Sequence, residues 1–127
     1  MSCSCSCKGS STMVLACSGA SNVGQLTNEV AMRLDMEKAA KFYCLAGPGG
    51  DIEPMVKAVK DADQLLVLDG CPVACAKLIM ERAGVADYEY VVVTELGIEK
   101  NRDFDLPEAD VDRVVAECRS KIECSDG

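Results

Sequence analysis

The chain has 127 residues, a formal net charge of −8, nine cysteines and no histidine. This length suits one domain with one hydrophobic core, and the acidic balance excludes a partner that presents a phosphate backbone, such as a nucleic acid. No apolar stretch approaches the roughly 20 residues that span a bilayer, so no membrane partner is predicted either.

Residues 1–11 alternate serine and cysteine and are expected to form a flexible tail, because they contain nothing to bury. With one lysine and no hydrophobic stretch, this segment is not predicted to be a secretory signal. We therefore expect a cytoplasmic protein with reduced thiols, in which metal binding or redox chemistry is favoured over a disulfide framework. Cys3, Cys5 and Cys7 are expected to scavenge soft metal ions without forming a specific site.

An alternation of strand and helix begins at Met13. The apolar run MVLAC predicts a first strand, and helical spacing of apolar residues predicts a helix from Asn22 to about Lys38, with Ser21 as its N-cap. A second strand is predicted near Lys41 to Leu45, followed by AGPGG as a loop.

The next helix is expected to start after Asp51 as its N-cap, with Pro54 in its first turn. QLLVLDG, at residues 64–70, is the clearest strand because it is apolar throughout, as expected for a strand buried on both faces. Pro72 is predicted to open the following helix, which ends at Gly84.

YEYVVVTELG, at residues 88–97, predicts the fourth strand, and Pro107 is predicted to open the last helix. The apolar stripe of that helix is Val111, Val114, Val115, Cys118 and Ile122. On this stripe Cys118 is expected to fill the core, whereas Cys124 is expected to be a solvated thiol.

Four repeats of strand and helix predict an α/β fold with three α/β/α layers and a mostly parallel four-stranded sheet. The expected strand order is 2-1-3-4, as in small Rossmann or flavodoxin-like folds. We predict a single domain over residues 12–124.

Four cysteines are expected at one edge of this sheet. Cys17, Cys44 and Cys71 end three neighbouring strands, and Cys75 follows one helical turn after Cys71. Neighbouring strands lie about 4.8 Å apart, whereas sulfurs around a tetrahedral zinc ion lie roughly 3.8 Å apart. Small side-chain movements would therefore bring the four sulfurs close enough to hold one ion.

Other uses of these cysteines stay open. Cys17 precedes the glycine-rich loop SGASNVG and could act as the nucleophile of a thiol enzyme, with Cys71 or Cys75 resolving it through a disulfide. A peroxide, a sulfur donor or an oxyanion such as arsenate would suit that chemistry. Four thiolates also suit an iron–sulfur cluster, which we favour less than zinc. The loop contains no arginine to hold a phosphate, which disfavours a cysteine phosphatase.

Several polar residues are expected near the same edge. Asp69 is predicted either to accept from helix N–H groups, to act near the sulfurs, or to cap the loop, and Gly70 to let the chain turn sharply. Thr94 and Glu95 end the fourth strand, and Glu95 is expected to be a solvated carboxylate rather than a ligand.

Four separated segments carry a resemblance to a known family. CSGASNVGQLTNEVA, FYCLAGPGG, VLDGCPVACAK and VVVTELGIEK, spread over about residues 13–100, resemble the DGC-domain family, named for its Asp-Gly-Cys motif. Members are described as zinc-binding candidates because of four potential chelating cysteines, which correspond here to Cys17, Cys44, Cys71 and Cys75. The resemblance implies a metal ion as partner and leaves open whether the chain is an enzyme.

Overall fold

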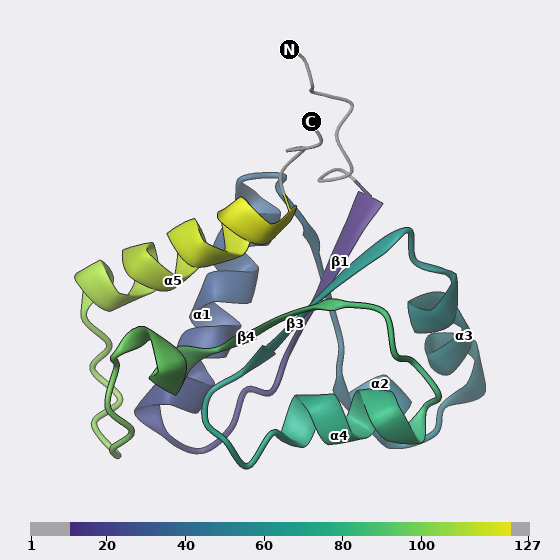
Figure 1. Cartoon of the computed structure of the whole chain (residues 1–127), viewed down its shortest axis with the longest axis horizontal. Helices are drawn as coiled ribbons and strands as arrows, with labels where there is room; N and C mark the ends of the chain where they lie inside the picture. The colour runs from purple at the N-terminus through teal and green to yellow at the C-terminus, as the bar shows by residue number, and fades with distance from the viewer. Residues whose placement is uncertain (1–10, 123–127) are drawn as a thin grey trace.

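The computed structural model describes residues 11–122, so Cys3, Cys5, Cys7 and Cys124 lie outside the described residues. The described chain is an α/β fold whose four-stranded sheet has the order β2-β1-β3-β4 (Figure 1). All three strand pairings are parallel. The predicted fold class and strand order are confirmed.

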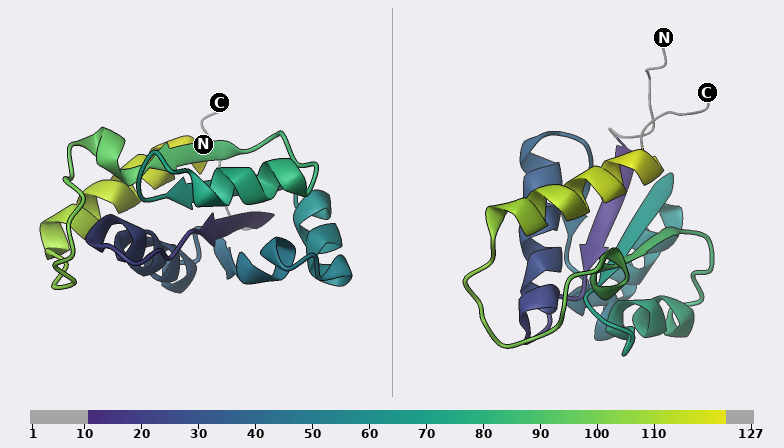
Figure 2. Two further views of the ribbon diagram at one scale, coloured as in Figure 1. Left: turned by 90° about the horizontal axis from the view of Figure 1, so that it is seen from below. Right: turned by 60° about the vertical axis from the view of Figure 1, so that its left-hand side comes forward.

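The helices form two layers around the sheet. Helices α1 and α5 cover one face, and α2, α3 and α4 cover the other (Figures 1 and 2). The strands are β1 (Thr12–Ala16), β2 (Lys41–Tyr43), β3 (Gln64–Asp69) and β4 (Glu89–Val92). The helices are α1 (Asn22–Met36), α2 (Ala46–Gly49), α3 (Glu53–Asp61), α4 (Cys75–Arg82) and α5 (Glu108–Ile122), with the short 3-10 helix η2 (Val93–Leu96) after β4.

The two central strands are buried on both faces, which explains their unbroken apolar sequences. Val14 of β1 and Leu66 of β3 pack under α1 and α5, while Leu15 and Val67 pack under the helices of the other face. The predicted stripe of α5 is buried throughout, and Cys118 has no exposed surface. No helix within residues 11–122 is both long enough and apolar enough to cross a membrane.

Two predictions for the segment after β2 are wrong. The AGPGG segment is not an open loop, because residues Ala46–Gly49 form the short helix α2. Asp51 is not the N-cap of α3: Ile52 occupies that position, and Asp51 adopts a left-handed conformation with φ of 59°. The Asp51 carboxylate instead accepts a hydrogen bond from Arg82 at 2.6 Å. Pro54 does lie in the first turn of α3, as predicted.

Helix α4 starts later, and β4 ends earlier, than the sequence predicts. Pro72 lies in a turn closed by a hydrogen bond from Ala74 N to Cys71 O (3.1 Å), and the helix begins only at Cys75. Proline suits the second position of such a turn, so its presence is explained without a helix start. Strand β4 ends at Val92, where η2 begins.

Candidate functional site

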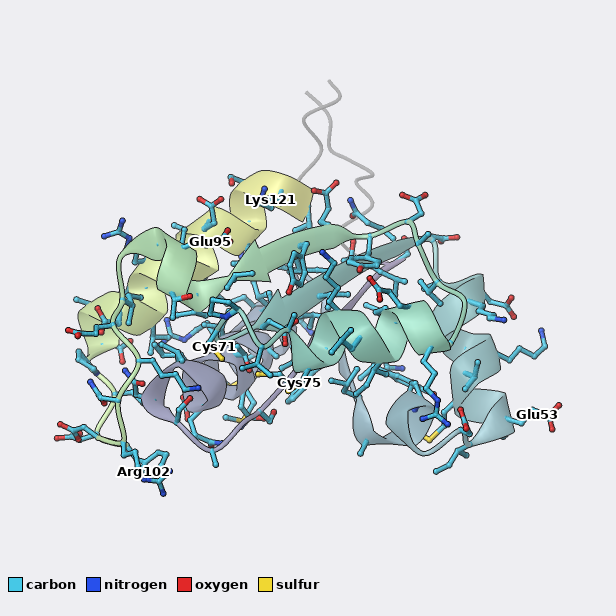
Figure 3. The ribbon with its side chains drawn as sticks, turned by 60° about the horizontal axis from the view of Figure 1, so that its bottom comes forward. Glu53, Cys71, Cys75, Glu95, Arg102 and Lys121 are labelled. Carbon is cyan, nitrogen blue, oxygen red and sulfur yellow. The ribbon has the colours of Figure 1, made fainter. Side chains whose placement is uncertain are left out.

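The sheet brings the four cysteines to its carboxyl edge. Cys17 directly follows β1, Cys44 directly follows β2, and Cys71 lies two residues beyond the end of β3. Because these strands are neighbours, their ends lie side by side. Cys75 is the first residue of α4, and Figure 3 shows it with Cys71 near the middle of this edge.

Cys17 is held by the sheet on one side and by α1 on the other. Its backbone N–H donates to Leu68 O at 3.0 Å, which extends the pairing of β1 with β3. Its Sγ lies 3.7 Å from the hydroxyl of buried Thr27. That hydroxyl donates to Gly24 O (2.7 Å) and accepts from Ser18 N (3.0 Å), so Thr27 connects the thiol to the first turn of α1.

The loop after Cys17 is fastened to α1. Gln25 Nε2 donates to Ser18 O (3.2 Å) and to Gly19 O (2.9 Å). Ser21 Oγ accepts from Gly24 N at 3.1 Å, which confirms Ser21 as the N-cap. A Cβ on Gly24 would lie 2.5 Å from Gly19 O, so only glycine permits this approach of loop to helix. The backbone of the loop that follows Cys17 is therefore fixed against α1.

Asp69 anchors the segment that carries Cys71 and Cys75. Its side chain is almost fully buried, and its carboxylate accepts from Ala76 N (2.8 Å), Lys77 N (3.0 Å) and Tyr90 Oη (2.7 Å). The two amides belong to the first turn of α4, which confirms that Asp69 accepts from helix N–H groups. Partial burial, and then the hydrogen bond to Asp69, raise the pKa of Tyr90 well above its usual value.

Gly70 lets the segment after β3 touch α1. A Cβ at this position would lie 2.7 Å from both Gly24 N and Val23 C, closer than real side chains approach a backbone. Gly70 O also accepts from Thr94 N at 3.1 Å. Within the Asp-Gly-Cys motif, the aspartate thus orients α4, and the glycine brings Cys71 against the loop that follows Cys17.

Two neighbouring cavities divide the four thiols between them. Cys17, Cys71 and Cys75 line a cavity of about 150 Å³, and Lys100 lies on its wall with Nζ 3.4 Å from Cys71 Sγ. Cys17 also lines a larger, mostly apolar cavity of about 520 Å³ that contains Cys44. The residues around the larger cavity are Ala16, Cys17, Ser18, Asn28, Phe42, Tyr43, Cys44, Leu45, Ala46 and Ile79.

The donor set suits a thiophilic metal ion, but its side chains are not gathered around one point. Thiolate sulfur is a preferred ligand of Zn²⁺. Within residues 11–122, however, no three cysteine, aspartate or glutamate side chains are arranged so that they could hold an ion. Cys17 and Cys71 are half-buried, whereas Cys44 and Cys75 are exposed. Metal binding would therefore require Cys44 and Cys75 to turn inward.

The predicted residues Thr94 and Glu95 differ in their distance from the cysteines. Two residues next to the cysteines, Thr27 and Lys100, were not predicted from the sequence. Thr94 contacts Gly70 through its backbone, while Glu95 is exposed on η2 and lines neither cysteine cavity. Thr27 was missed because it occupies a position on the apolar stripe of α1, four residues after Val23. Lys100 was missed because it lies in a loop, where no periodicity connects it with Cys71.

Comparisons with known proteins identify the family of the chain. The DGC domain matches residues 13–118. A curated relative from Pseudomonas aeruginosa, named anaerobic and virulence modulator AnvM, is 38% identical over 105 residues, which cover 83% of this chain and 80% of that protein. No solved structure matches the chain. The matched range includes all four cysteines at the sheet edge, and the chain belongs to the DGC-domain family.

Proposed function

We propose that the protein binds one zinc ion through Cys17, Cys44, Cys71 and Cys75. The observation that carries this proposal is the shared cavity: three of the four thiols line one space of about 150 Å³, and Cys17 connects it with the cavity that contains Cys44. We place the protein in the cytoplasm, where these thiols would stay reduced.

The local structure suits a site that closes when the ion arrives. Cys17 and Cys71 are half-buried and held by bonds of their neighbouring backbone, so they supply the fixed half of the site. Cys44 and Cys75 are exposed and can change rotamer at small cost. A zinc ion with four thiolates has no open position, so it would serve structure, storage or transfer and not hydrolysis.

Elemental analysis of untagged protein purified without oxygen tests this proposal. Tail cysteines could add metal, so the measurement uses a background in which Cys3, Cys5 and Cys7 are serine. We expect about one zinc per chain, and four thiols that react with a thiol reagent only after chelation. A brown preparation containing iron and sulfide would indicate a cluster instead.

Single serine substitutions identify the ligands. Replacing Cys17, Cys44, Cys71 or Cys75 is expected to lower the zinc content in each case, because all four share one ion. Cys118→Ala removes a cysteine of the core and serves as the matched control with unchanged zinc. Full zinc content in the Cys44→Ser variant would contradict the four-cysteine site.

A second candidate function, thiol redox chemistry, is favoured by the contact between Lys100 and Cys71. The Lys100 ammonium group lies 3.4 Å from Cys71 Sγ, within reach to donate a hydrogen bond to a sulfur that takes part in thiol chemistry. Cys17, the predicted nucleophile, lines the same cavity as Cys71 and Cys75, either of which could resolve it through a disulfide.

The redox step requires an oxidant, for which hydrogen peroxide is the simplest class. A thiolate would attack one peroxide oxygen, giving a sulfenic acid and, after protonation, water. A second thiol would then displace water to form a disulfide. Peroxide treatment of metal-free protein tests this function. A disulfide of Cys71 with Cys17 or Cys75 that forms equally well in wild type and in Cys44→Ser would favour redox chemistry over zinc binding.

A further inference from the structure

The loop of residues 97–107, between η2 and α5, is fixed to the start of α1 by Asn22. This residue is almost fully buried at the first position of α1. Its side-chain amide donates to Glu99 O (2.8 Å), and its side-chain oxygen accepts from Asn101 N (2.6 Å). Its own backbone N–H donates to Asn101 O at 3.0 Å. We call these three hydrogen bonds the Asn22 clasp.

Further contacts fix both sides of the clasp. Ile98 is buried in the core under α1 and α5. Arg102 Nη1 donates to Ala20 O at 3.2 Å, which ties the loop to the segment after Cys17. Figure 3 shows Arg102 on this loop at the lower left of the view, with Cys71 and Cys75 nearer the centre. The loop therefore has a defined path across the edge of the sheet where the cysteines lie.

The residue that the clasp positions is Lys100. It lies between Glu99 and Asn101, which are the two residues bonded to Asn22, and its Nζ donates to Cys71 Sγ at 3.4 Å. No other lysine or arginine of residues 11–122 lines the cavity of Cys17, Cys71 and Cys75. The loop of residues 97–107 thus places one ammonium group beside the thiols, although Lys100 lies about thirty residues after Cys71 in the sequence.

The position of the Lys100 ammonium group matters because the proposed site is strongly negative. Four thiolates around Zn²⁺ carry a formal charge of −2, in a chain whose net charge is already −8 without counting thiolates. An ammonium group that donates to one of the sulfurs offsets half of the local charge. We propose that Lys100 stabilises the metal-bound cysteine site by donating to Cys71. We further propose that the Asn22 clasp holds Lys100 in this position. This inference rests on the proposed zinc binding.

Zinc affinity, measured by competition with a chromophoric chelator on the full chain, tests the role of Lys100. Lys100→Met is expected to weaken zinc binding about tenfold, as for the loss of one hydrogen bond to a charged group. Lys100→Arg keeps the charge and should restore most of the affinity. Lys41→Met removes an exposed lysine at the start of β2 and is the matched control without effect. The gap between Lys100→Met and wild type should narrow at about 1 M salt, where screening is strong.

A double-mutant cycle tests the clasp. Asn22→Ala is expected to weaken zinc binding severalfold in the wild-type background and to have no further effect in Lys100→Met, because Asn22 acts through Lys100. Should Asn22→Ala fail to fold, Arg102→Ala loosens the same loop from the surface and replaces it in the cycle.

The outcomes separate this inference from the function on which it rests. Zinc bound equally well by wild type and Lys100→Met overturns the role of Lys100 and leaves the zinc site standing. Equal loss in the arginine and methionine variants overturns the charge argument. A wild-type chain that binds no zinc overturns both proposals.

Discussion

Asp69 joins three segments at the edge of the sheet where the cysteines lie. Its one carboxylate accepts from two amides of α4 and from the hydroxyl of Tyr90 on β4. A buried carboxylate is costly unless its oxygens are hydrogen-bonded, and here both oxygens have partners. The aspartate of the Asp-Gly-Cys motif thus has a structural role that is independent of any metal.

Replacing Asp69 is expected to destabilise the fold strongly. Asp69→Ala leaves two N–H groups and one hydroxyl without their acceptor, which costs about 3 kcal/mol in the free energy of unfolding. Tyr90→Phe removes one of the three bonds and should cost about 1 kcal/mol. Denaturant unfolding measures both changes, and the double variant should lose less than the sum because the residues share one interaction. Strict additivity would contradict the network.

Cys118 gives the fold a measurable dependence on alkaline pH. Burial raises the pKa of this thiol from 9.0 to about 12. The folded chain then holds a proton that the unfolded chain releases above about pH 9, so stability is full below that pH and falls as the pH rises towards 12. At about 1.4 kcal/mol per pH unit, the contribution lost by pH 10.5 is about 2 kcal/mol.

The comparison that isolates this effect is Cys118→Ala, measured with a reducing agent present. The variant lacks the ionisable group and should lose about 2 kcal/mol less than wild type between pH 8 and pH 10.5. Parallel pH profiles for the two proteins would show that the thiol does not titrate with unfolding.

Individual residues show how far sequence reasoning extends. The N-cap role of Ser21 and the core position of Cys118 follow from local pattern, because capping and helical periodicity act over a few residues. The contacts of Lys100 and Tyr90 join residues about 20 to 30 positions apart, and no local pattern specifies them. Local patterns thus predict capping and core residues, whereas contacts between distant side chains at the cysteine edge are not predicted by them.

At the scale of elements, glycine sets how closely the segment after β3 approaches α1. A Cβ at Gly70 would meet the backbone of Val23 and Gly24, neither of which can move without shifting the helix. Gly70→Ala is expected to cost about 2 to 4 kcal/mol in unfolding free energy, because it forces a backbone displacement in a packed region.

The same substitution should also disturb the cysteines, because it separates Cys71 from the loop that follows Cys17. Gly50→Ala is the matched control: its added Cβ would approach Ala46 O no closer than 3.4 Å, and its φ of −95° suits alanine. Denaturant unfolding of both variants tests the argument. Equal stability of Gly70→Ala and Gly50→Ala would show that the segment after β3 can move away from α1 at little cost in free energy.

Element boundaries were predicted well where periodicity is long and poorly where a distant side chain decides. Helices α1 and α5 are fifteen residues long and each carries an apolar stripe, and both helices lie where the sequence predicts them. The start of α4 depends on Asp69, whose carboxylate binds the amides of Ala76 and Lys77 and so moves the first helical turn beyond Pro72. Proline alone did not reveal this, since it also suits a turn.

At the scale of the whole molecule, topology was the most predictable feature and the assembled site the least. Alternating strands and helices restrict the chain to a parallel sheet with right-handed crossovers, which places Cys17, Cys44 and Cys71 at one edge. Whether the sulfurs meet depends on side-chain rotamers, which topology does not determine. The described residues divide the thiols between two cavities and leave their closure to a ligand.

Zinc is therefore expected to stabilise the entire domain and not only its edge. In the proposed site, the ion would be shared by the ends of β1, β2 and β3 and by the start of α4, and the unfolded chain would lack these combined ligands. At a free zinc concentration about 100 times the dissociation constant, the gain is about 2.7 kcal/mol. For a domain of this size, such a gain should raise the melting temperature by roughly 10 °C.

Thermal unfolding with and without zinc, followed by addition of a chelator, measures this shift. All proteins in this experiment carry serine in place of Cys3, Cys5 and Cys7, so that these residues do not contribute metal binding. Cys75→Ser should show a much smaller rise, since it removes the ligand that α4 supplies, while Cys118→Ala should show the full rise from a lower starting temperature. If zinc leaves the melting temperature of the parent protein unchanged and only accelerates its aggregation, the ion does not join the strand ends. The thiols would then serve chemistry that requires no metal, for which the pairing of Lys100 with Cys71 is the structural basis.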